Sequence, residues 1–149
     1  MPIDPQWQQQ WPHLGETDFE ETSPASNLYN CIAWAAGNTD RWWWPSDINY
    51  WPRRAPRAQT LEAFAEAYAS LGFELCSNSS FEEGFEKVAI YANELGIPKH
   101  AARQLPNGHW TSKLGQGIDI EHLNLSCLEG GAYGSVALVL RRIRCEAPK

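Results

Sequence analysis

The sequence lacks the long apolar and long basic stretches that mark two large classes of protein. No apolar run approaches the roughly 20 residues that a membrane-spanning helix needs. No basic run is longer than the pair Arg141-Arg142, and the formal net charge is −6. The concentrated positive charge that duplex-binding proteins present to phosphates is therefore missing. We expect neither a nucleic acid nor a membrane as partner.

Signals for export and for metal binding are also missing. The first residues, Met-Pro-Ile-Asp-Pro-Gln-Trp, lack the basic and apolar regions of a signal peptide. The cytoplasm is the expected compartment, with delivery as an effector as the alternative. The four cysteines form no Cys-x-x-Cys motif and no closely spaced set with histidine, so no structural zinc is expected. A reducing compartment disfavours disulfides between them. We expect no metal and no organic cofactor.

The size and composition of the chain are those of one folded domain. It has 149 residues, of which 43% are hydrophobic and 20% charged. No repeat or change of composition marks a second domain, so we predict a single domain over 1–149. Four prolines among glutamines and acidic residues predict an irregular N-terminal arm over about 1–25. The unusual component is tryptophan, with eight residues.

Two segments, 27–36 and 61–71, have the apolar spacing of short helices. Ser26 or Asn27 can cap the first, and Thr60 caps the second. Helices that precede an antiparallel meander predict an α+β domain. Strand-like patterns follow at 73–76, 87–92, 99–105, 109–114 and 133–143.

Cys31 and His100 are the candidates for nucleophilic chemistry. Cys31 lies in the first turn of the predicted 27–36 helix, where unpaired amides and the helix dipole favour a thiolate. A cysteine becomes a useful nucleophile when such a shift is combined with a neighbouring base. His100, at the start of the predicted 99–105 strand, is the candidate base. The alternative interpretation makes Cys31 a small core residue and His100 a structural histidine.

The turn after His100 predicts which side chains share a face of the sheet. Leu105-Pro-Asn-Gly-His109 fits a three-residue hairpin loop with glycine in the left-handed position. A two-residue loop would instead move Ser112 to the other face. The three-residue register puts on one face His100, Ala102, Gln104, Trp110, Ser112 and Leu114.

Three segments support this interpretation in their order along the chain. They are Asn-Cys-Ile-Ala-Trp at 30–34, Lys-Val-Ala-Ile-Tyr-Ala at 87–92, and His-Ala-Ala-Arg-Gln-Leu-Pro-Asn-Gly at 100–108. They resemble the nucleophile helix, the strand before the catalytic histidine, and the strand and turn that begin at that histidine in NlpC/P60-type cysteine peptidases. The resemblance spans about 27–114.

The resemblance implies a papain-like fold, with the nucleophile helix packed on an antiparallel sheet. It also implies a hydrolase that attacks a peptide or amide bond of a peptide, protein or peptidoglycan-like substrate. Cys31 would be the nucleophile that forms a thioester, and His100 the general base. Ser112 stands where the family places the His, Asn or Gln that orients the imidazole. Asn30 and Asn27 are the nearest candidates for oxyanion or substrate binding, because the glutamine that precedes the nucleophile of papain-type enzymes has no counterpart here.

A fainter resemblance joins residues 103–105, 110–115 and 119–122 to an uncharacterised group of small bacterial proteins within the superfamily. The last of these segments contains His122 beside two acidic residues. These groups offer a second way of orienting His100. The alternative interpretation of this segment is a solvated loop.

The tryptophan-rich segment 41–52 directly follows the predicted helix of Cys31. Either its rings pin the loop to the domain, or they form a wall of a cleft, since flat aromatic faces suit sugar rings and apolar side chains. Trp44 in this loop, with Trp110 and Gln104 on the predicted sheet face, completes the candidate substrate-binding residues.

Three functions follow from these residues. The first is a cysteine hydrolase that acts through Cys31 and His100. The second is a non-catalytic module that binds a peptide or glycan through the tryptophan-rich loop. The third is a toxin-like effector domain with protease or deamidase activity. The sequence leaves the oligomeric state open.

Overall fold

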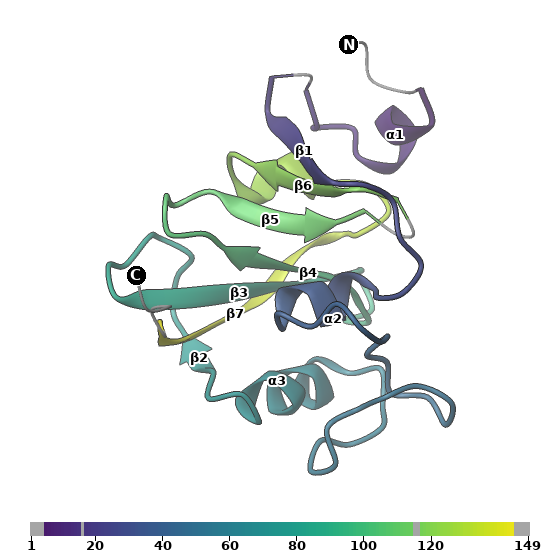
Figure 1. Cartoon of the computed structure of the whole chain (residues 1–149), viewed down its shortest axis with the longest axis vertical. Helices are drawn as coiled ribbons and strands as arrows, with labels where there is room; N and C mark the ends of the chain where they lie inside the picture. Colours follow the sequence, from purple (N-terminus) through teal and green to yellow (C-terminus); the bar gives the residue numbers. More distant parts are fainter. Residues whose placement is uncertain (1–4, 16, 115–116, 145–149) are drawn as a thin grey trace.

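One antiparallel sheet organises the part of the chain that the computed structural model describes, residues 5–15, 17–114 and 117–144 (Figure 1). Seven strands from these residues form it, in the order β1-β6-β5-β4-β3-β7-β2. The predicted α+β class is confirmed. The strands are β1 (Phe19–Ser23), β2 (Glu74–Cys76), β3 (Phe85–Ala92), β4 (Pro98–Gln104), β5 (Trp110–Lys113), β6 (Asp119–His122) and β7 (Ser135–Ile143).

The sheet is a meander only in its middle. Strands β3, β4, β5 and β6 are neighbours in chain order, whereas β7 lies between β3 and β2. β7 pairs with β3 along its whole length, from Phe85 opposite Ile143 to Ala92 opposite Ser135. The five predicted strands all form, with ends within two residues of the predicted ones.

Two strands at one side of the sheet, β1 at its edge and β6 beside it, were not predicted. β1 and β6 pair with each other, and β6 also pairs with β5. Each contains a single large apolar residue, Phe19 in β1 and Ile120 in β6, so neither gives a clear alternating pattern. The short helix α1 (Pro5–Gln10) and β1 both lie in the segment predicted to be an irregular arm. That prediction is wrong for these residues.

The two predicted helices form, but the first is short. α2 (Cys31–Ala35) begins only after Asn30, whose extended backbone and side-chain bond to the Ala33 amide make it the N-cap in place of either predicted residue. α3 (Leu61–Ala69) begins after Thr60, as predicted. None of the helices in the described residues is long and apolar enough to cross a membrane.

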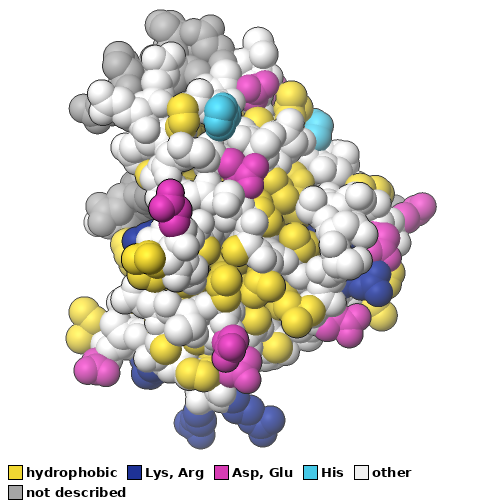
Figure 2. Space-filling model, turned by 180° about the vertical axis from the view of Figure 1, so that it is seen from behind, with side chains coloured by type: hydrophobic (Ala, Val, Ile, Leu, Met, Phe, Trp, Pro, Cys, Tyr) yellow, Lys and Arg dark blue, Asp and Glu magenta, His cyan; other side chains and the backbone are white. Residues whose placement is uncertain are grey.

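The sheet separates two hydrophobic cores. α2 and α3 pack on one face, which we call the helix face (Figure 1). The other face, which we call the opposite face, is covered by Trp11 and Leu14 of the N-terminal segment and by the 3₁₀ turn η1 (Leu125–Leu128). Seen from behind, hydrophobic side chains gather across the middle of the molecule (Figure 2). Because side chains alternate along a strand, Ala101 of β4 joins the core of the helix face and Ala102 that of the opposite face.

The hairpin between β4 and β5 has the predicted geometry. The amide of Leu105 donates to the His109 carbonyl at 2.8 Å, and Gly108 takes φ = 90°. Gln104 is paired with Trp110, which is the register of the three-residue loop. The predicted common face of the residues from His100 to Leu114 is therefore confirmed.

Candidate functional site

A cavity of about 290 Å³ lies where the start of α2, the loop after this helix and the start of β4 meet. Its volume suits one bulky side chain or one sugar ring. Most of the surface that lines the cavity is apolar, and three of its seven lining residues are aromatic. The lining residues are Asn30, Cys31, Trp42, Trp44, Asn49, Lys99 and Tyr133.

The tryptophan-rich loop combines the two arrangements that its sequence suggested. Trp43 and Trp51 are buried and pin the loop to the domain, since the Trp51 ring lies 4.9 Å from that of Phe64. Trp42 and Trp44 are only partly buried and line the cavity. The loop is therefore both anchored and exposed as a wall.

Each aromatic wall is held in a fixed orientation. The indole N–H of Trp42 donates to a backbone carbonyl 2.7 Å away, and the Trp44 ring meets Phe64 edge-on at 5.5 Å. The Tyr133 ring stacks on the imidazole of His100, with centroids 3.9 Å apart and planes 4° from parallel. A pocket with fixed walls loses little conformational entropy when it binds a ligand.

Asn30 has a structural part in this pocket. Its side-chain oxygen accepts the amides of Ala33 and Trp43, each at 3.1 Å, and its amide group donates to the Trp43 carbonyl at 2.8 Å. Asn30 thus joins the start of α2 to the loop. Asn27 is exposed and contributes the backbone carbonyl that receives the Trp42 indole. A contact of either side chain with a substrate stays a prediction.

The environment of Cys31 favours the neutral thiol over the thiolate. Cys31 is the first residue of α2, as the sequence predicted, and lines the cavity. Burial raises the pKa of this thiol to about 11, although backbone amides of Ala101 and Ile32 and its own amide favour the thiolate. At neutral pH the sulfur is protonated. Cys31, Cys76 and Cys127 are free thiols.

His100 belongs to a hydrogen-bonded chain on the opposite face. The Oγ of Ser112 lies 2.9 Å from His100 Nε2 and 2.8 Å from His122 Nε2, and His122 Nδ1 lies 2.8 Å from the Asn124 carbonyl. A carbonyl only accepts, so His122 Nδ1 carries the proton and its Nε2 accepts from Ser112. Ser112 in turn accepts from His100 Nε2. The predicted contact between His100 and Ser112 is confirmed.

No hydrogen bond joins Cys31 to His100 among the described residues. Cys31 packs against the core of the helix face, beside Ala101, whereas His100 points to the opposite face. Nε2 of His100 pairs with Ser112, whereas Nδ1 is buried with no hydrogen-bond partner among the described residues. Side chains on β4 alternate between the two faces of the sheet. Ala101 therefore faces α2, and the adjacent His100 points to the opposite face. The catalytic roles of these residues stay predictions.

The interpretation of the segment of His122 as a solvated loop is wrong. The segment forms β6, and His122 is buried as the last side chain of the chain from His100. Burial lowers its pKa to about 4. Burial, together with the opposing charge of His122, keeps the pKa of His100 well below 6.5. The signal that could have found it is the two-residue spacing that puts Ile120 and His122 on the same side of a strand.

Trp110 and Gln104 do not line the cavity. Both are buried on the opposite face, Trp110 among the apolar residues of that core. The Gln104 amide is 3.5 Å from the carbonyls of Ser79 and Gly108, a distance at the limit of hydrogen bonding. A role in substrate binding for these two residues stays a prediction that their burial does not favour.

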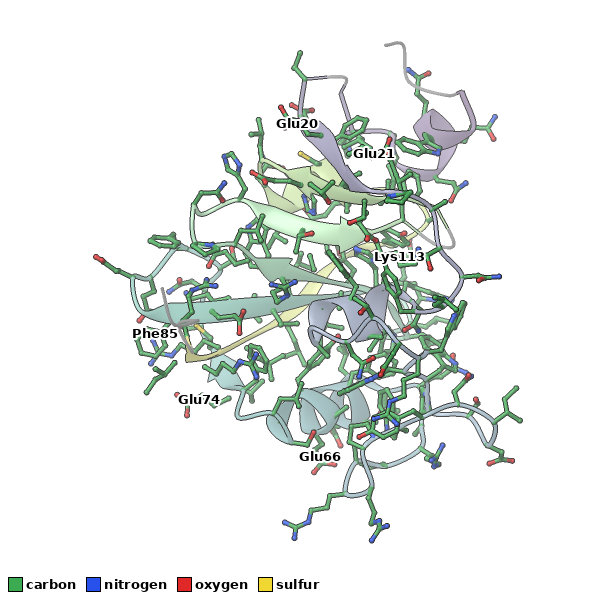
Figure 3. The ribbon with its side chains drawn as sticks, viewed as in Figure 1. Glu20, Glu21, Glu66, Glu74, Phe85 and Lys113 are labelled. Atoms are coloured by element: carbon green, nitrogen blue, oxygen red, sulfur yellow. The ribbon has the colours of Figure 1, made fainter. Side chains whose placement is uncertain are left out.

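A buried polar cluster supports the start of α2. The Tyr29 hydroxyl donates to Asp119 Oδ2, and the Lys113 ammonium lies 4.9 Å above the Tyr29 ring. The side chains of Lys113 and Asp119 are completely buried. Figure 3 shows Lys113 at the end of β5, beside the segment that leads into α2. The cluster fixes Tyr29, two residues before Cys31, and with it the edge of the cavity.

Among the described residues, no group of three or more His, Cys, Asp or Glu side chains is placed to hold a metal ion.

Comparison with known proteins gives one match. No protein of curated function and no solved structure matches the chain. A family model described as a domain of unknown function (DUF7689) matches residues 20–141, from β1 to the last third of β7. The chain therefore belongs to the DUF7689 family.

Proposed function

We propose that this chain is a binding module that holds one apolar side chain or sugar ring of a peptide or glycan in the cavity beside Cys31. The observation that carries the proposal is the set of rigid aromatic walls formed by Trp42, Trp44 and Tyr133. Aromatic rings provide large contact areas and lose little side-chain freedom on binding. The pocket is already formed without a ligand, as small-molecule and side-chain pockets commonly are.

The cysteine hydrolase is the second candidate, and the papain-like assignment of the α+β fold belongs with it. One observation favours it: Cys31 starts a helix and borders the same cavity, where a carbonyl group could approach the sulfur. Two observations weigh against it. The raised pKa of the thiol leaves little thiolate at neutral pH, and the imidazole of His100 bonds to Ser112 on the opposite face. Binding without catalysis accounts for all of these features.

Replacing Trp42 with alanine is expected to weaken ligand binding at least tenfold. Trp42 lines the cavity, and tryptophans at binding sites commonly contribute more than about 1.4 kcal/mol. Ligands are obtained by selecting a phage-displayed library of random 12-residue peptides and by probing an array of neutral and acidic oligosaccharides. Dissociation constants are then measured by fluorescence anisotropy for the wild type and for Trp42→Ala.

The matched control is Ile48→Ala. Ile48 lies in the same loop, is 91% exposed and does not line the cavity, so its loss leaves affinity within twofold. Urea unfolding verifies that both variants are folded. Binding that survives Trp42→Ala unchanged, or a library and array that yield no ligand, would refute the proposed function. Hydrolysis of a selected peptide that stops in Cys31→Ala would establish the second candidate instead.

A further inference from the structure

The cavity has a cationic rim. Lys99, the second residue of β4, lines the cavity and is exposed. Among the residues that the structure describes, its ammonium has no ion pair and no hydrogen bond. An exposed charge beside apolar walls costs little to leave unpaired in the free protein, and is available to a ligand of the opposite sign.

The loop that forms the aromatic walls is also basic. The connection between α2 and α3, residues 36–60, contains four arginines and two aspartates, in a chain whose net charge is −6. Arg41, next to Trp42, lies 3.7 Å above the Tyr50 ring and has no ion pair among the described residues. Arg57 donates to backbone carbonyls of the loop, including that of Asn49 at 3.2 Å. Lys99 therefore supplies the one positive charge among the residues that line the cavity, and the loop that contributes two of the aromatic walls carries a net positive charge in an acidic protein.

The size and polar groups of the cavity suit a peptide. A volume of about 290 Å³ holds one large side chain and leaves the rest of a long ligand outside. Asn49 donates its side-chain amide to Ser46, and its side-chain oxygen has no donor among the described residues. That oxygen can accept a peptide N–H at the rim, while Lys99 and Arg41 can receive carboxylates.

From this charge complementarity we propose that the ligand is an acidic linear peptide, with a bulky apolar side chain in the cavity and an adjacent carboxylate on Lys99. This inference rests on the proposed function and specifies its ligand. An anionic lipid surface is the competing occupant, because Ile48 at the exposed part of the loop is a residue that a membrane interface could receive. A cavity with room for one side chain beside the charge of Lys99 favours the peptide, because a membrane surface would not need to fill it.

The peptides selected by the wild-type protein test the inference. We expect them to share a bulky apolar residue next to Glu or Asp, and we expect resynthesised peptides to bind at least tenfold more weakly when those acids are replaced with Gln or Asn. Lys99→Glu removes this preference, and Lys99→Arg, which keeps the charge, retains it. The preference also diminishes between 0.05 and 0.5 M NaCl.

Each other outcome overturns the inference in a recognisable way. Neutral peptides or neutral glycans that bind in a Trp42-dependent manner refute the acidic ligand and leave the proposed function standing. Binding of the protein to vesicles of phosphatidylcholine with phosphatidylserine that falls in Ile48→Ala, without any selected peptide, identifies a membrane surface instead. The absence of any Trp42-dependent ligand refutes both proposals.

Discussion

Lowering the pH from 6.5 to 5 is expected to reduce the free energy of unfolding by about 3 kcal/mol. The cause is the pair of buried imidazoles, His100 and His122. Their pKa values in the folded protein lie below the ordinary value of 6.5, at about 4 for His122, so the folded state binds fewer protons than the unfolded chain. The stabilisation is fully present above pH 6.5 and is lost as the pH falls towards the folded-state pKa values.

Urea unfolding at several pH values measures this slope. The pKa values of Glu82 and Glu121 are lowered from 4.5, so these carboxyl groups take up protons only below that pH. The change in stability between pH 6.5 and 5 therefore reports on the histidines. His122→Asn should remove about half of the pH dependence. A free energy that is flat across this window, or imidazole resonances of His100 and His122 that titrate near pH 6.5, would contradict the buried chain.

Asp119→Asn is expected to cost roughly 3 kcal/mol of stability at pH 7. The carboxylate of Asp119 accepts from the Tyr29 hydroxyl and balances the charge of the buried Lys113 ammonium, whose other partner is the Gly117 carbonyl at 2.7 Å. Without it, the ammonium has no counter-ion among the residues that the structure describes. Because Tyr29 leads directly into α2, we also expect weaker ligand binding in this variant.

The matched control is Glu20→Gln on β1, which removes the same charge from an exposed side chain that has no ion pair or hydrogen bond among the described residues (Figure 3). Its free energy of unfolding should stay within about 0.5 kcal/mol of the wild type. The double variant Lys113→Met with Asp119→Asn should recover part of the loss, because it leaves no unpaired charge. Equal stability of Asp119→Asn and Glu20→Gln would show that the buried cluster has no energetic role.

Much of the fold could be predicted because its local signals agree with its packing. The 61–71 pattern and Thr60 defined α3, and the Pro-Asn-Gly turn fixed the register between β4 and β5. β1 and β6 could not be predicted, since pairing with neighbouring strands stabilises them while each has only one large apolar residue. Their stability depends on contacts that are distant in sequence.

The candidate site was predictable only in part for a similar reason. The sequence placed Cys31 at a helix start and His100 at a strand start, and both positions are confirmed. It could not show which face of β4 would meet α2. Neighbouring residues of a strand face opposite sides of the sheet. In the structure Ala101 faces the Cys31 sulfur, and His100 points away from it. The aromatic cavity depends on the same packing, which local patterns do not encode.

The rate of alkylation of Cys31 by iodoacetamide as a function of pH, in the wild type and in His100→Ala, tests the central claim most directly. A pocket that binds without a thiolate–imidazole pair predicts slow labelling at pH 7, slower than at the more exposed Cys76. The rate should rise about tenfold per pH unit towards pH 11, identically in both proteins. Fast labelling near neutral pH that His100→Ala abolishes would contradict this account and restore the cysteine hydrolase.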